Sequence, residues 1–373
     1  MKIGFIVQTL SGGGAERVVS VLSSKFADMP GFEPSVLILF PKDKEYSTNK
    51  GVSRIYLFAS EKAYRLASKR ERIKQIRNAV RANDIKAIFP FLWFVGVYTQ
   101  VACLGLDVRI IQTIRNNPAL VPHSKMARML RDWALSISYG VFCQNQEQFD
   151  YLPRRVRKKT RVIPNPVAEE FFALRAEPSK QEKIVMFGRL EKQKNYPMMI
   201  RAVHGLKKAG KAFSVEIYGE GSLAGKLQNE IDCTGLHDVV KLMGRTENPS
   251  DVMRDAALFV MTSSFEGMPN SLMEAMAAGL PCISTDCPTG PANLIEDGID
   301  GYLVGVDDDR ALSKRIETLM SDADLRRRIG AAGRAKVSAL YKPDCIAREL
   351  ANYFLQEDAF TDAHGGGQNQ FPV

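Results

Sequence analysis

Two carboxylates separated by seven residues, Glu266 and Glu274, stand in the stretch of this sequence that is richest in potential chemistry. Gly267 and Pro269 predict a loop, and a helix is expected to begin at Pro269 or Asn270. Glu266 then lies in the loop, and Glu274 lies about one turn into the helix. The free backbone amides at the helix start could bind an anion such as a diphosphate.

Two cations follow an apolar, β-rich run over residues 183–187. Arg189 and Lys194 stand in the segment Gly188–Asn195, which is expected to connect this strand to a helix. Ligands of open α/β folds bind at the carboxyl edge of the sheet, where such loops lie. Arginine grips phosphate oxygens with a planar fork, and lysine adds a compact charge. The pair therefore suits a diphosphate, and the alternative interpretation is two solvated surface cations.

A glycine-rich loop follows the first predicted strand, in the segment Ser11–Arg17. Gly13 and Gly14 would let backbone amides approach an anion at the start of the next helix. A plain tight turn is the alternative. A dinucleotide fingerprint is disfavoured, because Arg17 stands where that motif needs its third glycine.

Short apolar runs alternate with stretches of helical periodicity throughout the chain, which predicts parallel sheets covered by helices on both faces. Two prolines in the segment 163–167 predict an extended linker between two such α/β domains. Before the linker, strands are expected at Ile3–Val7, Val36–Phe40, Ile55–Phe58, Ala87–Phe91, Val108–Gln112 and Tyr139–Cys143. After it, they are expected at Lys183–Phe187, Phe213–Tyr218, Val239–Met243, Leu258–Met261 and Cys282–Ser284.

Composition is that of a globular protein, with 373 residues, 45% apolar and 25% charged. The six cysteines form no CxxC pair, and the sequence start lacks the pattern of a cleavable leader. These features predict a cytoplasmic protein without a disulfide framework or a structural zinc site. The apolar run over 89–106 is interrupted by polar residues and is expected to be a buried strand and helix rather than a membrane span.

The net charge of +9 is distributed unevenly. Residues 1–166 hold 27 Lys and Arg against 12 Asp and Glu, or +15, and the remaining residues hold 24 against 30, or −6. The basic half could attract nucleic acid, anionic lipid or a phosphorylated substrate. Its cations are concentrated in two stretches, which are Lys62, Arg65, Lys69, Arg70, Arg72, Lys74, Arg77, Arg81 and Arg154, Arg155, Arg157, Lys158, Lys159, Arg161.

The glycine loop, the two cations and the two glutamates, in this order along the chain, resemble the retaining glycosyltransferases of family 4, which have the GT-B fold. The resemblance covers about residues 1–355. It implies two Rossmann-like domains that face each other across a cleft. Residues 1–164 would bind the acceptor and residues 165–345 the nucleotide sugar. A helix over 346–360 would cross back to the first domain, and residues 361–373 would form a disordered tail.

The resemblance also implies roles for individual residues. Arg189, Lys194 and Glu266 would be catalytic: the two cations would neutralise the donor diphosphate and its departing charge, and Glu266 would lie near the transferred sugar. Glu274 would accept hydrogen bonds from the ribose hydroxyls. The other donor-binding positions would be Gly13, Gly14, Gly188, Gly244, Arg245, Gly267, Met268, Pro269, Asn270, Ser271 and Leu272. Of these, Gly244 and Arg245 match the segment that holds the nucleotide base.

One departure from the family pattern concerns the first domain. Many relatives carry a histidine near the donor sugar, whereas this chain has Arg115 and Asn116 there, and these two are expected to occupy the acceptor or sugar corner. The segment Cys287–Pro291 resembles a loop of bacterial members that build polysaccharide, which favours a UDP-linked hexose or N-acetylhexosamine. No metal or other cofactor is expected, because the protein's cations can neutralise the diphosphate.

The resulting prediction is a hexosyltransferase that takes a glycan acceptor, for which a polyprenyl-diphosphate-linked glycan is the candidate, in the assembly of a bacterial surface polysaccharide or glycoprotein glycan. The basic first half would attach it to the anionic inner face of the membrane as a peripheral protein. Two alternatives stay open. One is a sugar-nucleotide-modifying enzyme of the same shape, such as an epimerase, and the other is a basic nucleic-acid-binding protein, for which no recognition motif is found.

Overall fold

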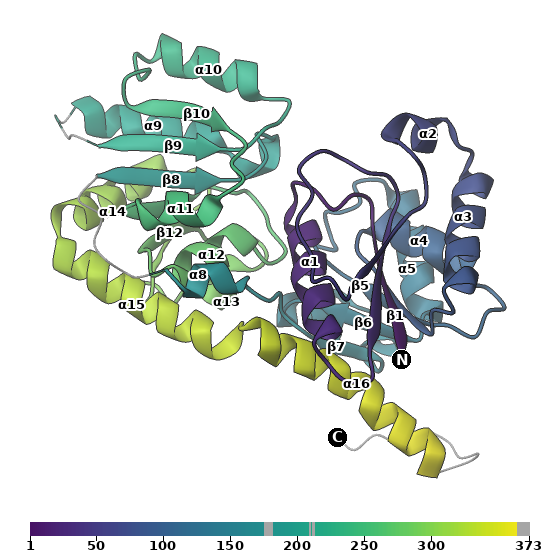
Figure 1. Ribbon diagram of the computed structural model, residues 1–373. Helices are drawn as coiled ribbons and strands as arrows, with labels where there is room; N and C mark the ends of the chain where they lie inside the picture. The colour runs from purple at the N-terminus through teal and green to yellow at the C-terminus, as the bar shows by residue number, and fades with distance from the viewer. Residues whose placement is uncertain (175–181, 209, 211–212, 364–373) are drawn as a thin grey trace.

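The computed structural model describes residues 1–174, 182–208, 210 and 213–363, and side-chain burial up to residue 354. Two α/β domains stand side by side, and the long C-terminal helices run from the second domain back along the first (Figure 1). Each domain contains one sheet whose strands are all parallel. The α/β prediction with two Rossmann-like domains is therefore confirmed.

The first sheet has seven strands in the order β3-β2-β1-β4-β5-β6-β7. Its strands are β1 (Lys2–Val7), β2 (Glu33–Ile38), β3 (Ser53–Tyr56), β4 (Ala87–Pro90), β5 (Arg109–Thr113), β6 (Gly140–Cys143) and β7 (Thr160–Val162). Its helices are α1 (Gly14–Ala27), α2 (Glu61–Leu66), α3 (Lys69–Ala82), α4 (Trp93–Ala102), α5 (Lys125–Ile137), α6 (Gln146–Tyr151) and α7 (Arg154–Arg157).

The second sheet has six strands in the order β10-β9-β8-β11-β12-β13. Its strands are β8 (Lys183–Phe187), β9 (Ser214–Tyr218), β10 (Val240–Gly244), β11 (Leu258–Met261), β12 (Cys282–Thr285) and β13 (Tyr302–Val304). The helices of this half are α8 (Glu169–Phe172), the 3-10 turn η1 (Lys192–Lys194), α9 (Tyr196–Lys208), α10 (Ala224–Cys233), α11 (Pro249–Arg254), α12 (Asn270–Ala277), α13 (Pro291–Leu294), α14 (Asp309–Ser321), α15 (Ala323–Leu340) and α16 (Pro343–Ala363).

The observed strands overlap all eleven that the sequence predicts. The short edge strands β7 and β13 are not anticipated, because three residues are too few to show a period. The run over 89–106 contains the end of β4 and the whole of α4. Within the described residues, no helix combines the length and apolarity that a membrane crossing needs.

Apolar residues form a core on each face of both sheets. Against β1, helix α1 buries Val18, Val19, Leu22 and Phe26 at helical spacing. The same core contains Ile346, Leu350 and Phe354 from α16, so this helix packs on the first domain although it follows the second. Helix α16 extends to Ala363, three residues into the predicted tail, and residues 364–373 lie outside the described part.

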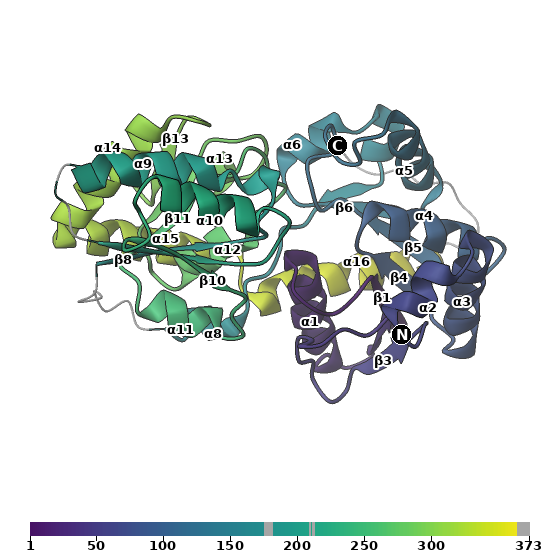
Figure 2. The ribbon, with the colours of Figure 1, turned by 90° about the horizontal axis from the view of Figure 1, so that it is seen from above.

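The linker between the domains is fixed by burial and by a main-chain hydrogen bond. Asn165 is buried, and the backbone amide of Val167 donates to the carbonyl of Tyr341, 2.9 Å away. Figure 2 shows α1 on the side of the first domain that faces the second. The segment after β1 therefore meets the loops that follow β8 and β11.

Candidate functional site

The predicted donor-binding residues follow two neighbouring strands of the second sheet. Strands β8 and β11 are adjacent, and from them the chain winds outward in opposite directions. Such a point, where the strand order reverses, leaves a crevice at the carboxyl ends of the strands. Arg189 and Lys194 follow β8, and Glu266 and Glu274 follow β11. The topology thus brings all four to one edge of the sheet.

Lys194 and Glu266 form an ion pair, with Nζ and Oε1 2.6 Å apart. Glu266 is 7% exposed, and its main chain is fixed by bonds with Pro288 and Thr289 at 3.1 Å each. A Cβ on Gly188 would lie 2.8 Å from Cε of Lys194, so a side chain at position 188 would displace the lysine from this position. The pair is built by two loops that lie 72 residues apart in the sequence.

Glu274 is paired with a residue of the first domain. It is the fifth residue of α12, is 7% exposed, and accepts a hydrogen bond of 3.1 Å from Nη1 of Arg17 on α1. The Arg17 guanidinium also lies 5.1 Å from the ring centroid of Tyr46 and 5.4 Å from that of Phe171. Burial raises the pKa of Glu274, and the charge of Arg17 opposes that rise. Sequence reasoning assigned no role to Arg17.

Arg189 is exposed, and its charge acts on the carboxyl of Glu16, the residue before Arg17. Burial raises the pKa of the Glu16 carboxyl, and a backbone hydrogen bond and the charges of Arg189 and Lys42 oppose the rise. Glu16 and Arg17 are consecutive at the start of α1, and they interact with Arg189 and Glu274 respectively. The sequence does contain a signal for these contacts, which is an acidic and a basic residue directly after a glycine loop. Only the glycines were assigned a role from the sequence.

The starts of α1 and α12 are in direct contact. Nδ2 of Asn270 donates to the carbonyl of Gly14 at 2.8 Å, and Oδ1 of Asn270 accepts from Asn165 at 2.6 Å. A Cβ on Gly14 would lie 2.8 Å from Nδ2 of Asn270, so a side chain at position 14 would disturb this contact. Gly13 caps the N-terminus of α1 in an extended conformation. Two predicted donor-binding glycines therefore lie at the domain boundary.

The predicted sugar corner lies against the loop that carries Glu266. A Cβ on Gly267 would lie 2.8 Å from both the carbonyl oxygen of Arg115 and Cα of Asn116. The carbonyl of Gly267 also accepts a hydrogen bond of 3.0 Å from Asn145 of the first domain. Only a residue without a side chain lets the two domains approach this closely here, which explains the glycine after Glu266.

Arg115 is a cation in a confined position. Its guanidinium lies 4.2 Å from the ring centroid of Phe91, and Nη1 donates to Oδ1 of Asn165 at 2.7 Å. Its Nε is buried and has no hydrogen-bond partner among the described residues. Burial lowers the pKa of this guanidinium. An anionic or hydroxyl-rich ligand would supply the missing acceptor.

Other predicted donor-binding residues also make hydrogen bonds within the protein. Arg245 donates from Nη1 to Oγ of Ser11 and from Nη2 to the carbonyl of Lys44, both at 2.9 Å, so this segment bridges to the first domain. The amide of Leu272 donates to the carbonyl of Pro269 at 3.1 Å. Among the first amides of α12, those of Asn270 and Ser271 precede the first intrahelical bonds and remain suited to an anion.

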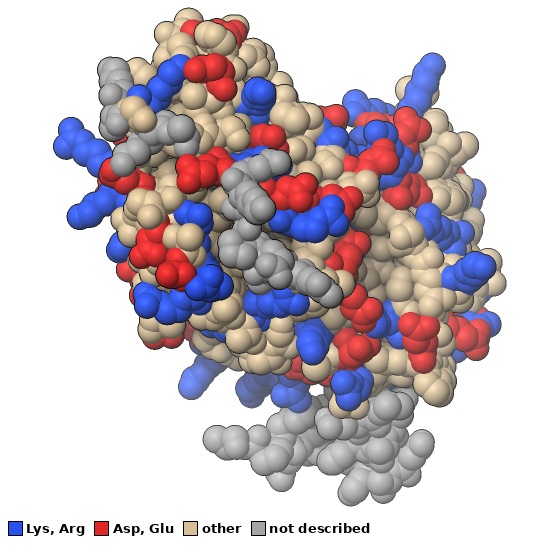
Figure 3. All heavy atoms as spheres, turned by 60° about the vertical axis from the view of Figure 1, so that its left-hand side comes forward, with Lys and Arg blue, Asp and Glu red and all other residues tan. Residues whose placement is uncertain are grey.

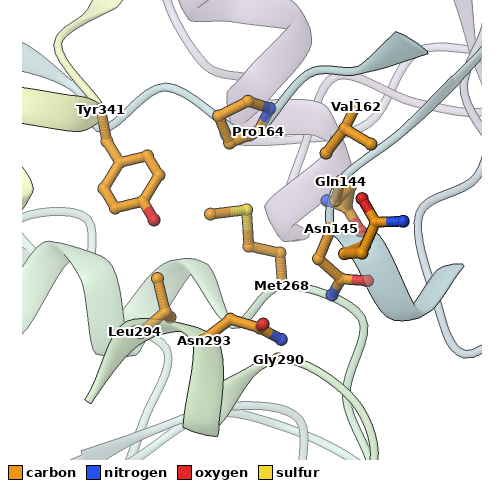
Figure 4. A pocket seen from close by; sticks show the side chains of 10 residues that line it. Gln144, Asn145, Val162, Pro164, Met268, Gly290, Asn293, Leu294 and Tyr341 are labelled. Carbon is orange, nitrogen blue, oxygen red and sulfur yellow. The ribbon is translucent and has the colours of Figure 1, made fainter. Parts of the chain in front are cut away.

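A hollow of about 260 Å³ lies beside the linker (Figure 4). Met268 projects into it, and the ring of Tyr341 and the amides of Asn145 and Asn293 surround it. Of the predicted donor-binding side chains, the lining contains Met268 but none of the charged ones. Among the described residues, no group of three or more His, Cys, Asp or Glu side chains is arranged to hold a metal ion.

Comparisons with known proteins identify the family and the fold. The family model "Glycosyl transferases group 1" matches residues 167–336. The amylovoran biosynthesis glycosyltransferase AmsD of Erwinia amylovora is 30% identical over 360 residues, which cover 93% of this chain and 98% of that protein.

A second relative is from Campylobacter jejuni and is named as a GalNAc-alpha-(1->4)-GalNAc-alpha-(1->3)-diNAcBac-PP-undecaprenol alpha-1,4-N-acetyl-D-galactosaminyltransferase. It is 27% identical over 334 residues, which cover 88% of this chain and 91% of that protein.

Solved structures share the fold. Alr3699/HepE of Anabaena, in complex with UDP and glucose, superposes with a TM-score of 0.79 at 17% identity and covers 95% of this chain and 99% of that one. TarM of S. aureus, in a complex that contains UDP, also gives a TM-score of 0.79, at 14% identity and with the same coverage. The two-domain arrangement is thus that of GT-B glycosyltransferases.

Proposed function

Because the chain belongs to the glycosyl transferases of group 1, we propose that it transfers a hexose or N-acetylhexosamine from a UDP-linked donor to a glycan acceptor with retention of anomeric configuration. The arrangement at the carboxyl ends of β8 and β11 carries this proposal. There Lys194 contacts Glu266, Glu274 contacts the start of α1, and the charge of Arg189 acts on that same helix start. This is the edge at which an open α/β sheet binds a nucleotide.

The reaction breaks the bond between the anomeric carbon and the diphosphate oxygen and forms one from that carbon to an acceptor hydroxyl oxygen. Negative charge develops on the departing diphosphate, where Arg189, Lys194 and the first amides of α12 stabilise it. The proton of the acceptor hydroxyl passes to the departing phosphate oxygen. Glu266 stands beside the transferred sugar, and Glu274 accepts hydrogen bonds from the ribose. The reaction needs no metal ion, because these fixed cations meet the leaving charge.

The acceptor we propose is a glycan linked to a polyprenyl diphosphate. Two features support it: the charge of +15 over residues 1–166, and the undecaprenol-linked substrate in the name of the Campylobacter relative. The first domain would hold this acceptor, with Arg115 and Asn116 at the corner next to Gly267. The enzyme would work at the inner face of a bacterial membrane, in surface polysaccharide or glycoprotein glycan assembly.

A panel of nucleotide sugars tests the donor. A ligand that binds only the folded protein raises Tm, by an amount that corresponds to about 2.7 kcal/mol at one hundred times Kd. UDP-hexoses and UDP-N-acetylhexosamines are expected to raise Tm more than GDP- or dTDP-sugars. A protein that responds to no nucleotide sugar contradicts the proposal.

Transfer assays test the site. Arg189→Ala and Glu274→Gln are expected to lower kcat/KM by about 100-fold or more, on the scale of one lost transition-state or charged contact. The matched control is Arg201→Ala, which removes an exposed cation on α9 that pairs with Asp309, and it should leave transfer unchanged. Proton NMR of the product reports the new anomer: an inverted linkage refutes retention, and an epimer formed without acceptor favours the epimerase alternative.

A further inference from the structure

Helix α5 carries an apolar face that points away from the protein. Met126, Met129, Leu130, Trp133 and Ile137 recur at helical spacing and are exposed by 72, 71, 46, 38 and 44%. At 100° per residue they lie within one sector of the helix, so they form a continuous stripe. Figures 1 and 2 show α5 beside α4 in the first domain, away from the second sheet.

The opposite face of α5 attaches the helix to the domain. Arg131 is buried and donates from Nη1 to the carbonyls of Pro118 and Val121, 2.6 Å from each. Ala134 and Leu135 are buried beside it. A surface helix ordinarily turns its apolar stripe to the core and its charges to water. Here a buried arginine anchors the helix and leaves a broad apolar stripe in solvent, an arrangement that marks an interaction surface.

A basic segment is fastened to the C-terminal end of the same helix. Helix α7 contacts α5, and Nζ of Lys159 donates to the carbonyls of Ser136, at 2.9 Å, and Ser138. Residues 152–161 contain six Lys and Arg and no Asp or Glu, and Arg154, Arg155 and Lys158 are exposed. The same surface therefore combines apolar side chains with concentrated positive charge.

The other basic stretch, over residues 62–81, contains both partnered and exposed cations, as does the segment over residues 152–161, where Nη1 of Arg157 lies 4.0 Å from Oδ1 of Asp150. Arg65 pairs with Glu61, the guanidinium of Arg72 lies 4.1 Å from the ring centroid of Tyr64, and Arg77 donates to the carbonyls of Ala102 and Leu104. On the second domain, basic and acidic side chains alternate over the face in Figure 3. The segment over residues 152–161 differs from the stretch over residues 62–81 in lying against α5, the helix with the exposed apolar stripe.

We propose that helix α5 docks in the headgroup region of an anionic bilayer, with Met129, Leu130 and Trp133 below the headgroups and the basic segment on the lipid phosphates. An interfacial helix combines these elements, since apolar burial and attraction to anionic lipid add, and tryptophan is favoured at that depth. This deepens the proposed function and rests on its lipid-linked acceptor. Arg131 ties α5 to the segment that begins at Arg115, so a docked helix holds the acceptor corner near the membrane.

Vesicle flotation of the full chain tests the surface. Vesicles of phosphatidylcholine with about one third phosphatidylglycerol are expected to bind the protein at low salt, and phosphatidylcholine alone to bind it much less, because the charge attraction is lost. Met129→Gln with Trp133→Gln should lower partitioning by about tenfold or more. The matched control is Met243→Gln with Ile299→Gln, two apolar residues of the second domain that are similarly exposed, and it should bind like wild type.

The basic segment is tested in the same assay. Arg154→Gln with Arg155→Gln and Lys158→Gln should weaken binding to anionic vesicles by about tenfold or more. Arg70→Gln with Lys74→Gln and Arg81→Gln on α3 removes the same charge from exposed positions of the other stretch and should weaken it far less. Equal losses would overturn the assignment to α5 and its neighbour.

Tryptophan fluorescence reports the contact directly, because Trp93 and Trp133 are the two tryptophans of the chain. In a Trp93→Phe variant, emission from Trp133 should shift to shorter wavelength with anionic vesicles and be quenched by brominated lipid. An unchanged spectrum, or a wild-type dimer that the α5 variant converts to monomer without any vesicle binding, overturns the proposal.

Transfer to a soluble glycan in the absence of vesicles separates the two hypotheses. If that activity persists while no vesicle binding is found, docking of α5 fails and the transferase function stands. If vesicles bind and no sugar is transferred, the proposed function fails and the docking surface stands.

Discussion

The contact between Arg17 and Glu274 joins the domains, and its removal provides the sharpest test of the site. Arg17→Met deletes the guanidinium that lies 3.1 Å from Glu274 and keeps an unbranched side chain between Tyr46 and Phe171. Glu274 then remains buried without its cation. Burial already raises the pKa of Glu274, and the variant removes the charge that opposes that rise.

The expected magnitude follows from the burial of the pair. The side chains of Arg17 and Glu274 are 16% and 10% exposed. Removing one partner of a buried ion pair costs about 3–5 kcal/mol, and the residual exposure here favours the lower end. For domains of this size, about 3 kcal/mol corresponds to a fall in Tm of roughly 6–12 °C. The exposed pair of Arg65 with Glu61 is the matched control, and Arg65→Met should change stability by less than about 1 kcal/mol.

A double-mutant cycle with Glu274→Gln isolates the interaction. Arg17→Met with Glu274→Gln leaves no buried charge unpaired, so the double variant is expected to be more stable than Arg17→Met alone. The free energies of unfolding are measured by urea denaturation at pH 7. Two single effects that simply add would refute the coupling, as would an Arg17→Met variant with the wild-type Tm.

The pH dependence of the stability of Arg17→Met provides an independent test of the contact. In Arg17→Met, the folded protein holds a proton on Glu274 to a higher pH than the unfolded chain does. The loss in free energy of unfolding relative to wild type is therefore small below the ordinary pKa of glutamate, and it grows as pH rises through the elevated pKa of Glu274. If Glu274 binds ribose, the same protonation raises KM for the donor at low pH, while the wild-type KM varies less.

Three further outcomes are expected. Gly267→Ala places a Cβ 2.8 Å from the main chain of Arg115 and should lower both Tm and kcat. The control is Gly225→Ala in α10, where the new Cβ meets nothing within 4 Å, and it should be neutral or stabilise the protein by up to about 1 kcal/mol. Thermal melts and initial rates compare the two variants, and equal effects would count against the close approach of the two domains at Gly267. Burial raises the pKa of Glu16, so this carboxyl makes stability fall as pH rises from the ordinary pKa of glutamate through its elevated value, and Glu16→Gln should remove that part of the slope of Tm against pH; a variant with the wild-type slope would contradict it. Transfer should survive EDTA and dialysis, and activity that returns only on addition of a divalent ion would show that the protein's cations are insufficient.

The features of the fold and of the site that depend on local sequence pattern could be predicted. Strand after strand could be located because β-rich apolar runs alternate with helical periods, and the charged loops could be placed because parallel strands end at one edge of a sheet. The meeting of Lys194 with Glu266 is of this kind, since β8 and β11 are neighbours. Glu274 could be placed one turn into a helix because proline and glycine mark the boundaries of α12.

Contacts between distant segments could not be obtained in this way. Arg17 and Glu274 lie 257 residues apart, and their pairing depends on how the two domains pack against each other. The burial of Arg115 over Phe91 likewise depends on packing between two loops of the first domain. A buried charge and an exposed one look the same in a sequence, because desolvation is a property of everything that surrounds the group.

The sequence by itself determined the alternation of strands and helices, the division into a basic and an acidic half, and the types of side chain at the strand ends. Only the tertiary structure decided which face of α5 is buried. Its apolar period is visible in the sequence and would ordinarily indicate the core, yet the hydrogen bonds of Arg131 turn the opposite face inward. Periodicity shows that a helix has two faces, and packing against the neighbouring loops determines which of them meets water.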